Sequence, residues 1–188
     1  MNSSKKKRII LCVVSVASML GVQVAFADTW SGGRSSALRY TYYDSSVSTY
    51  GYGGSFDSAR NNWNSISSKV FIYSSLSYND PKADVYYVGN SSDPTLIGLT
   101  NAYKDHSGTL AFTTDLWAYC TVTIYDNNMK SNNMNSSQVI SNATHEIGHS
   151  LSLDHPYVTS NSAVMKKGIQ SIGPTTYDKS ELKSKWGS

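Results

Sequence analysis

Two histidines four residues apart, His145 and His149, have the spacing that lets two imidazoles bind one metal ion. On an α-helix, residues at i and i+4 lie on the same face one turn apart, so both rings can reach the same ion. Glu146 is carried on the same turn, where it can act as general base on a water bound to that ion. His155, six residues after His149, would add a third nitrogen and leave the fourth position of a tetrahedral zinc ion open. The pattern predicts a catalytic zinc site.

Geometry requires this helix to end soon after His149. If the helix continued to His155, that residue would lie about 9 Å further along the axis and about 240° around it. Zn–N bonds of about 2.0–2.1 Å do not permit such an arrangement. We therefore expect the helix to end between Leu151 and Leu153, and the chain to turn back beneath the metal.

The run 145–155 resembles the metzincin zinc-binding pattern HExxHxxGxxH. The glycine of that pattern falls on Ser152, for which a left-handed conformation would cost roughly 1–2 kcal/mol. The run 162–165 resembles the Met-turn of the same family, which implies that Met165 lies beneath the metal. Lys167 stands where astacin-like and serralysin-like enzymes carry a tyrosine ligand, so the site looks closer to the matrixins.

The resemblance implies an α+β, metzincin-like fold. Its N-terminal subdomain would be of α/β type, with a twisted, mostly parallel sheet and an antiparallel edge strand beside the active-site helix. A small C-terminal subdomain would hold the Met-turn and a terminal helix. The function implied is that of a secreted zinc metalloendopeptidase, in which Glu146 activates a zinc-bound water to cleave an extended peptide or protein substrate.

Two alternatives remain open at this point. One is a catalytically weak or inactive secreted binding or adhesion domain on the same scaffold, which the tyrosine-rich, weakly charged segments would suit. Glu146 argues against it, because a purely structural metal site does not need a general base. The other is a metal-dependent hydrolase for a non-peptide substrate, which the HExxH pattern alone permits.

Residues 1–27 have the features of a secretory signal peptide. Lys5–Arg8 is basic, Ile9–Val24 is mostly apolar, and Ala25–Ala27 supplies a small-residue cleavage site. We expect cleavage after Ala27 and one secreted catalytic domain over residues 28–188. The alternative is an uncleaved membrane anchor, since the apolar run approaches spanning length.

Removal of this segment changes the charge balance. The full chain has 16 basic and 13 acidic residues, and residues 5–8 hold four of the basic ones, so the remainder carries 16 − 4 − 13 = −1. No basic patch then argues for a nucleic-acid partner. We expect a monomer without membrane association, in which Cys120, the one remaining cysteine, is a buried small hydrophobe.

A second cation is less clearly indicated. Calcium is a candidate for the loop carboxylates, although solvated side chains are the simpler interpretation. A structural zinc is not expected, because His106 is the one histidine outside the motif. The carboxylates concerned are Asp80, Asp93, Asp105 and Asp126.

Hydrophobic periodicity predicts the elements before the motif. Leu38, Tyr40 and Tyr42, at period two, predict a first strand that buries this face. Residues 55–66 predict an amphipathic helix capped by Ser55, with one apolar stripe formed by Phe56, Ala59, Trp63 and Ile66. Strands are expected at 70–73 and 84–88, separated by a turn at 79–81.

Further elements lead into and out of the motif. Strands are expected at 108–112 and 121–125, and the first of these resembles the matrixin edge strand. A polar loop at 127–133 should precede the motif helix, which Ser136 or Ser137 would cap. Asp178 would cap a terminal helix that continues through Trp186.

Overall fold

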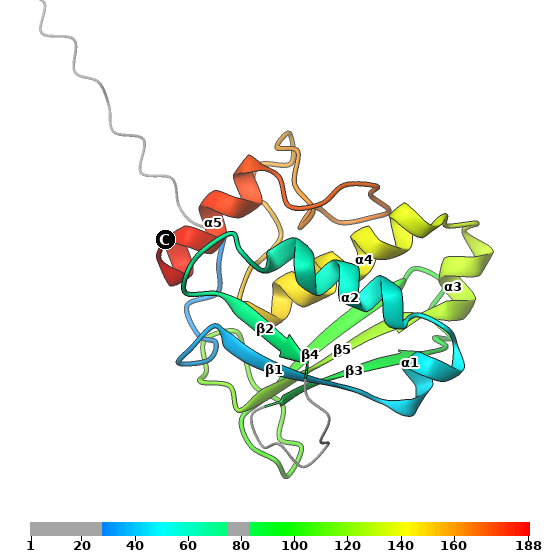
Figure 1. Cartoon of the computed structure of the whole chain (residues 1–188), viewed down its shortest axis with the longest axis horizontal. Helices are drawn as coiled ribbons and strands as arrows, with labels where there is room; N and C mark the ends of the chain where they lie inside the picture. Colours follow the sequence, from blue (N-terminus) through cyan, green and yellow to red (C-terminus); the bar gives the residue numbers. More distant parts are fainter. Residues whose placement is uncertain (1–27, 75–82) are drawn as a thin grey trace, which may run out of the picture.

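The computed structural model describes residues 28–74 and 83–188 (Figure 1). The expected signal peptide at 1–27 and the expected turn at 79–81, with its candidate calcium ligand Asp80, lie outside the described residues. Within the described ranges, no helix is both long enough and apolar enough to cross a bilayer.

Five strands form one mixed sheet in this part of the chain, in the order β2-β1-β3-β5-β4. The pairs β1–β2, β1–β3 and β3–β5 are parallel, and β4 runs antiparallel to β5 at one edge. The expected α/β character is confirmed, whereas the sheet alone does not establish a metzincin-like fold. The strands are β1 (Leu38–Tyr43), β2 (Phe71–Ser74), β3 (Ala83–Gly89), β4 (Gly98–Tyr103) and β5 (Tyr119–Tyr125).

Five helices accompany this sheet in the described residues, and α2 and α4 lie side by side across one of its faces (Figure 1). Helix α4 carries the HExxH residues and also contacts the edge strand β4. The motif is therefore placed between the sheet edge and the C-terminal segment. The helices are α1 (Ser45–Thr49), α2 (Gly53–Trp63), α3 (Asp126–Ser131), α4 (Ser136–Ser150) and α5 (Thr176–Trp186).

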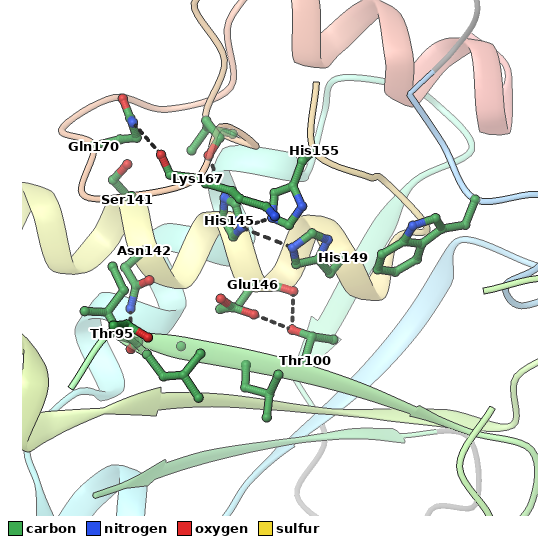
Figure 2. Close-up of a pocket in the computed structure, with 17 residues that line it drawn as sticks. Thr95, Thr100, Ser141, Asn142, His145, Glu146, His149, His155, Lys167 and Gln170 are labelled. Carbon is green, nitrogen blue, oxygen red and sulfur yellow. Dashed lines mark hydrogen bonds between the residues drawn. The ribbon is translucent and has the colours of Figure 1, made fainter. Parts of the chain in front are cut away.

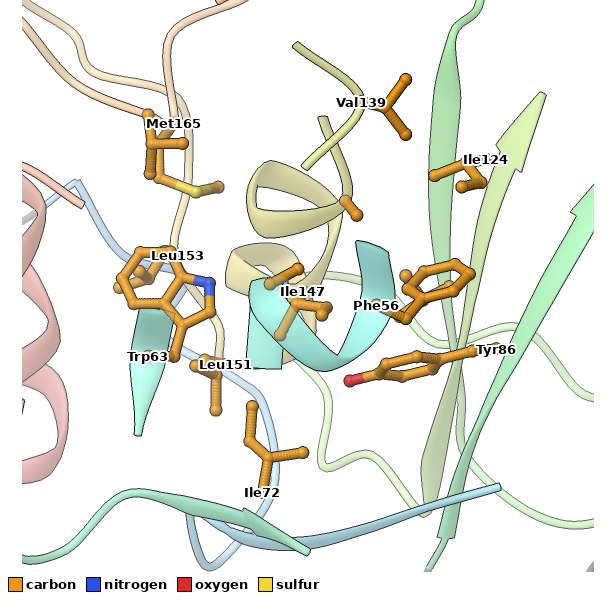
Figure 3. Close-up of a cluster of buried hydrophobic side chains, with 14 of the residues drawn as sticks. Phe56, Trp63, Ile72, Tyr86, Ile124, Val139, Ile147, Leu151, Leu153 and Met165 are labelled. Atoms are coloured by element: carbon orange, nitrogen blue, oxygen red, sulfur yellow. The ribbon is translucent and has the colours of Figure 1, made fainter. Parts of the chain in front are cut away.

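The main hydrophobic core lies between the sheet and these two helices (Figure 3). Phe56 and Trp63 of α2 are fully buried, as the predicted apolar stripe requires, and so is Ile147 of α4. The Trp63 indole Nε1 donates a hydrogen bond of 2.8 Å to the Thr144 carbonyl, which ties α2 to α4 one residue before the first motif histidine. The core thus fixes the helix that positions the site.

Burial alternates along strand β1 with the predicted period of two. The buried face, however, is the one opposite to the predicted face. Leu38 and Tyr40 are 52% and 42% exposed, whereas Arg39 and Thr41 are each 1% exposed. The expectation that the face with Leu38 and Tyr40 is buried is wrong. The physical reason is that Arg39 points inward, where its guanidinium donates a hydrogen bond of 3.3 Å to the Ser150 carbonyl at the end of α4.

The edge strand is also not where the sequence placed it. Residues 108–112 form no strand, and Leu110 makes an isolated bridge to Tyr103. The edge is β4, whose polar sequence GLTNAY has no hydrophobic alternation. It is a strand because every residue from Gly98 to Tyr103 pairs with β5, a tertiary effect that local propensity does not report.

The polar stretch expected to be a loop at 127–133 is largely helix α3. Two interactions explain this helix. The Asn128 side chain donates hydrogen bonds of 2.7 Å to the carbonyls of Asp93 and Leu96, and Met129 is buried in the core. The polar composition of this segment predicts a loop, but two of its side chains, Asn128 and Met129, are buried.

Helix α4 begins one residue earlier than its predicted serine caps. Its N-cap is Asn135, whose side chain accepts a hydrogen bond from the Gln138 backbone N–H. The Gln138 side chain in turn accepts from the Asn135 backbone N–H, which completes a capping box. Ser136 and Ser137 are the first two helical residues.

The caps of two other helices differ from the prediction in the same way. The N-cap of α5 is Thr175, and Asp178 is the N3 residue of its capping box. Helix α2 begins after Tyr52 rather than at Ser55, and it ends before Ile66. Each predicted helix exists, with a boundary displaced by a few residues.

We expect Asn135→Ala to lower the free energy of unfolding by about 1 kcal/mol, because it removes the N-cap hydrogen bond of α4. Urea unfolding followed by circular dichroism measures the change. Ser137→Ala is the matched control and should change stability by less than about 0.5 kcal/mol. A larger loss of unfolding free energy in the Ser137 variant would show that Ser137, as predicted from the sequence, is the N-cap.

Candidate metal centre

The three predicted histidine ligands lie together around the C-terminal half of α4 (Figure 2). The Nε2 atom of His145 is 3.1 Å from that of His149 and 3.3 Å from that of His155. One ring nitrogen from each histidine lies within 4.8 Å of the other two. The described residues contain no other group of three or more His, Cys, Asp or Glu side chains arranged to hold an ion.

Backbone carbonyls determine which nitrogen of two of these rings carries the proton. His145 Nδ1 is 2.9 Å from the Val164 carbonyl, and His149 Nδ1 is 2.8 Å from the Leu153 carbonyl. A carbonyl can only accept, so each Nδ1–H donates and each neutral ring keeps a lone pair on Nε2. Lone pairs facing one another at 3.1 Å repel unless a cation lies between them. The donor set therefore fits Zn²⁺, which imidazole nitrogens commonly bind.

Burial keeps these imidazoles neutral, as metal ligands must be. It lowers the pKa of His145 to about 4 and lowers the pKa of His149 well below its usual value. His155 is less enclosed, and burial followed by the charge of Lys167 lowers its pKa. Neutral rings are consistent with the backbone hydrogen bonds described above.

The turn after α4 confirms the predicted helix end. The last helical residue is Ser150, and Ser152 has φ of 65°. Ser152 N–H donates to the His149 carbonyl at 2.9 Å, and Leu153 N–H donates to the Gly148 carbonyl at 3.1 Å. These two bonds are the Schellman pattern, with Ser152 in the position that usually holds glycine. The chain thus reverses early enough for the next histidine to reach the first two.

Met165 packs against helix α4 at Gly148. It is 2% exposed, and a Cβ added at Gly148 would lie 2.3 Å from its sulfur. The glycine between the motif histidines therefore allows this close approach. Asp178 of α5 fixes the Met165 segment, because its carboxylate accepts from the backbone N–H groups of Val164, at 2.9 Å, and Met165, at 3.2 Å.

The Glu146 side chain points from α4 toward strand β4 (Figure 2). Its carboxylate accepts a hydrogen bond of 2.9 Å from the Thr100 hydroxyl, and a Cβ added at Gly98 would lie 2.7 Å from it. Burial raises the pKa of Glu146 to about 8, and the Thr100 hydrogen bond partly opposes this shift. The carboxyl therefore faces a confined space lined by a strand backbone.

That space is a cavity of about 540 Å³ that also contains the three histidines. Its walls come from β4 with the loop before it, from α4 and from the segment after Met165. A small substrate group could enter beside both the histidines and Glu146. Lining residues beyond the motif include Leu96, Ile97, Leu99, Asn142, Lys167 and Gln170.

The N-terminal segment completes the site in a way that the sequence did not predict. The Trp30 ring stacks on His149 with 5.1 Å between centroids and 12° between planes. Its backbone N–H donates to the Ser152 carbonyl at 2.9 Å. The Asp28 carboxylate accepts from the Tyr157 backbone N–H at 2.8 Å and from the Tyr177 hydroxyl. These contacts join residues far apart in the sequence, so local spacing carried no signal for them.

The remaining candidate metal ligands are used locally. Asp93 accepts from the Thr95 hydroxyl at 2.7 Å, and Asp105 accepts from the Ser107 hydroxyl at 2.6 Å. Asp126 accepts from Tyr52 and pairs with Lys130. Cys120 is a buried free thiol, as predicted, and His106 stacks on Tyr119. Among the described carboxylates, none joins a cluster that would hold calcium.

Comparisons with known proteins show similarity to solved structures, and none to protein-family models or curated proteins. No protein-family model matches the chain. No curated protein matches either. Solved structures do match, among them a chain of the structure described as "GM1 bound form of the ECX AB5 holotoxin". That match has a TM-score of 0.50 and 13% sequence identity, and it covers 79% of this chain and 80% of the other. At this identity the likeness concerns the fold.

These findings correct the family assignment made from the sequence. No family model or curated protein supports a metzincin, a matrixin or a metallopeptidase, and the matching structure quoted above is described as a holotoxin. We therefore withdraw the assignment to the metzincins, together with the endopeptidase function and the peptide substrate that rested on it. The physical reason is that the motif determines the arrangement of four side chains, whereas the substrate is determined by surfaces outside it.

We expect Ser152→Gly to raise the free energy of unfolding by about 1 kcal/mol, because glycine adopts positive φ without strain. The change also removes a buried Ser152 hydroxyl that has no hydrogen-bond partner among the described residues. Thermal melts of the two proteins at equal metal content measure the effect. Ser150→Gly, in the last turn of α4, is the control and should destabilise by a similar amount. A lower melting temperature for Ser152→Gly would contradict the strain argument.

Proposed function

We propose that this chain is an exported zinc-dependent hydrolase whose ion is held by His145, His149 and His155. The observation that supports this proposal is the set of neutral Nε2 atoms that face one another beside a buried glutamate. When bound there, Zn²⁺ would act as a Lewis acid and lower the pKa of a coordinated water toward about 7. We assign no class of bond to the reaction, because peptide specificity came from the withdrawn family assignment.

The chain's own groups have separate roles in this proposal. Glu146 takes the proton of the attacking water and returns it to the leaving group, a role suited to a carboxyl whose pKa is raised by burial. Thr100 holds the Glu146 carboxylate against β4. The carbonyls of Leu153 and Val164 orient two of the rings, so that each presents Nε2 to the ion.

The export and the domain organisation remain proposals. Export is proposed from the signal-like sequence at 1–27. The domain organisation proposed is one catalytic domain over residues 28–188. The finer description of the fold belongs to the same proposal: the antiparallel edge β4, helix α4 and the turn above Met165 form the frame of the site. A monomer that acts without membrane association is the simplest form consistent with this frame.

Two substitutions test the proposed function when zinc content and turnover are measured separately. His155→Ala removes one of three ligands, so zinc retained after dialysis should fall from about one equivalent to well below it. Glu146→Gln keeps the zinc and should lower turnover by about 10²–10⁴-fold, the usual contribution of a general acid–base. A panel of activated ester, amide and labelled protein substrates, with and without a chelator, would identify the class of bond.

Unchanged zinc content in the His155 variant would show that the third ligand is wrong. Undiminished turnover in the Glu146 variant would show that the reaction does not use this carboxyl. His106→Ala, on a histidine outside the centre, is the matched control and should change neither quantity.

A second candidate function is binding, and the observation that favours it is an uncharged aromatic face on the sheet. We use "aromatic face" for the exposed side chains Leu38, Tyr40, Phe71 and Tyr73. They form two adjacent cross-strand pairs of β1 and β2, and the Tyr40 and Tyr73 rings stack at 5.2 Å. Exposed apolar patches of this kind mark interaction sites, and a structurally similar chain belongs to an assembly described as bound to GM1, a glycolipid.

If the aromatic face binds a glycan, Tyr40→Ser together with Tyr73→Ser should reduce binding at least tenfold, since both rings that would stack on a sugar are lost. Surface plasmon resonance over immobilised GM1 oligosaccharide and an uncharged oligosaccharide measures this. The control is Tyr157→Ser, which removes a tyrosine that is 90% exposed elsewhere on the molecule. Equal binding by the double variant and the unaltered protein would rule out this face as the glycan site.

A further inference from the structure

One charged side chain in the cavity has no role in the metal centre as described so far. Apart from the histidines, the charged residues that line the cavity are Glu146 and Lys167. Lys167 belongs to the exposed segment that follows Met165, and Figure 2 shows it beside His145 and His155. Its charge is among the causes that lower the pKa of all three histidines, after burial. The ammonium group therefore lies close to the centre.

No described carboxylate pairs with this ammonium group. The ion pairs of the described residues involve other lysines and arginines, or join Asp154 to His155, and Glu146 is hydrogen-bonded to Thr100. The one contact of Lys167 in Figure 2 is made by its backbone carbonyl, which accepts from the Gln170 side chain at 3.4 Å. The Lys167 ammonium group, which lines the cavity, is therefore free to pair with a ligand.

The charge balance of the cavity indicates which ligand. Three neutral imidazoles contribute no charge, and Lys167 contributes +1. Glu146 contributes −1 when it is ionised and nothing when it is protonated. With a Zn²⁺ ion the sum is 2 − 1 + 1 = +2 in the first case and 2 + 1 = +3 in the second, in surroundings where charges are weakly screened. Lys167 and the ion repel each other, and an anion between them would remove this repulsion. An anionic group is therefore the partner that this cavity favours.

We propose that Lys167 binds a carboxylate of the substrate beside the zinc centre, so that the hydrolase selects substrates with an acidic group next to the cleaved bond. This inference rests on the proposed function and adds the chemical class of the substrate. Lys167 is on this view a specificity residue. It acts through charge. Another polar side chain of the cavity, that of Asn142, is already engaged with the Ile97 carbonyl at 2.9 Å.

The proposal predicts a coupling between zinc and a carboxylate that can be measured without turnover. Zinc affinity is determined by competition with a chromogenic chelator, in sodium acetate and in sodium chloride of equal ionic strength. In the unaltered protein, acetate should strengthen zinc binding at least fivefold, the lower end of typical coupling between two ligands. In Lys167→Met, zinc should bind more tightly in chloride, because the repulsion is gone, and acetate should add less than about twofold.

Two further variants separate charge from structure. Lys167→Arg keeps the positive charge and should retain the acetate effect. Lys166→Met, on the adjacent lysine that does not line the cavity, should behave as the unaltered protein. Equal acetate effects in Lys167→Met and the unaltered protein would overturn the role of Lys167 and leave the zinc site intact. Failure of the unaltered protein to bind one zinc ion would instead overturn the proposed function, and this inference with it.

Discussion

The site depends on the reversal of the chain directly after helix α4. Two histidines on one helical face can share an ion without any help from the fold, but a third can join them only if the helix stops within a few residues. Ser152 provides this stop by adopting a left-handed conformation, and the two backbone bonds of the Schellman turn return the chain beneath the helix. The same turn directs the Leu153 carbonyl at His149, so one local structure both brings His155 to the other two histidines and orients His149.

The first ligand is oriented from a different part of the chain. His145 donates to the Val164 carbonyl, and the Val164 backbone N–H is held by Asp178 at the start of α5. Trp30 stacks on the remaining face of His149 from the N-terminal segment. His145 and one face of His149 are therefore positioned by segments distant from α4. An eleven-residue motif sets the spacing of the ligands, and the surrounding fold sets their direction.

How much of this could be predicted depended on whether the cause was local. The helix end after Ser150 was predicted correctly from the short distances that a shared ion would require of the three histidines. The buried face of β1 was predicted wrongly. Arg39 points inward because it donates a hydrogen bond to a carbonyl of α4, and strand periodicity carries no information on that partner. Helix α3 and the edge strand β4 were missed for the same reason. Asn128 of α3 bonds to carbonyls in the loop before β4, and β4 pairs with the β5 backbone.

The two candidate functions use opposite faces of the sheet, and this bears on how they relate. Thr100 and Gly98 direct one face of β4 toward Glu146 and the cavity. Leu38 and Tyr40 of β1 lie on the other face, because Arg39 between them points to the helices. A partner bound on the aromatic face would not enter the cavity, so binding there and hydrolysis at the metal centre do not compete for the same residues. The proposed binding on the aromatic face and the proposed hydrolysis at the histidine centre are therefore compatible in one chain.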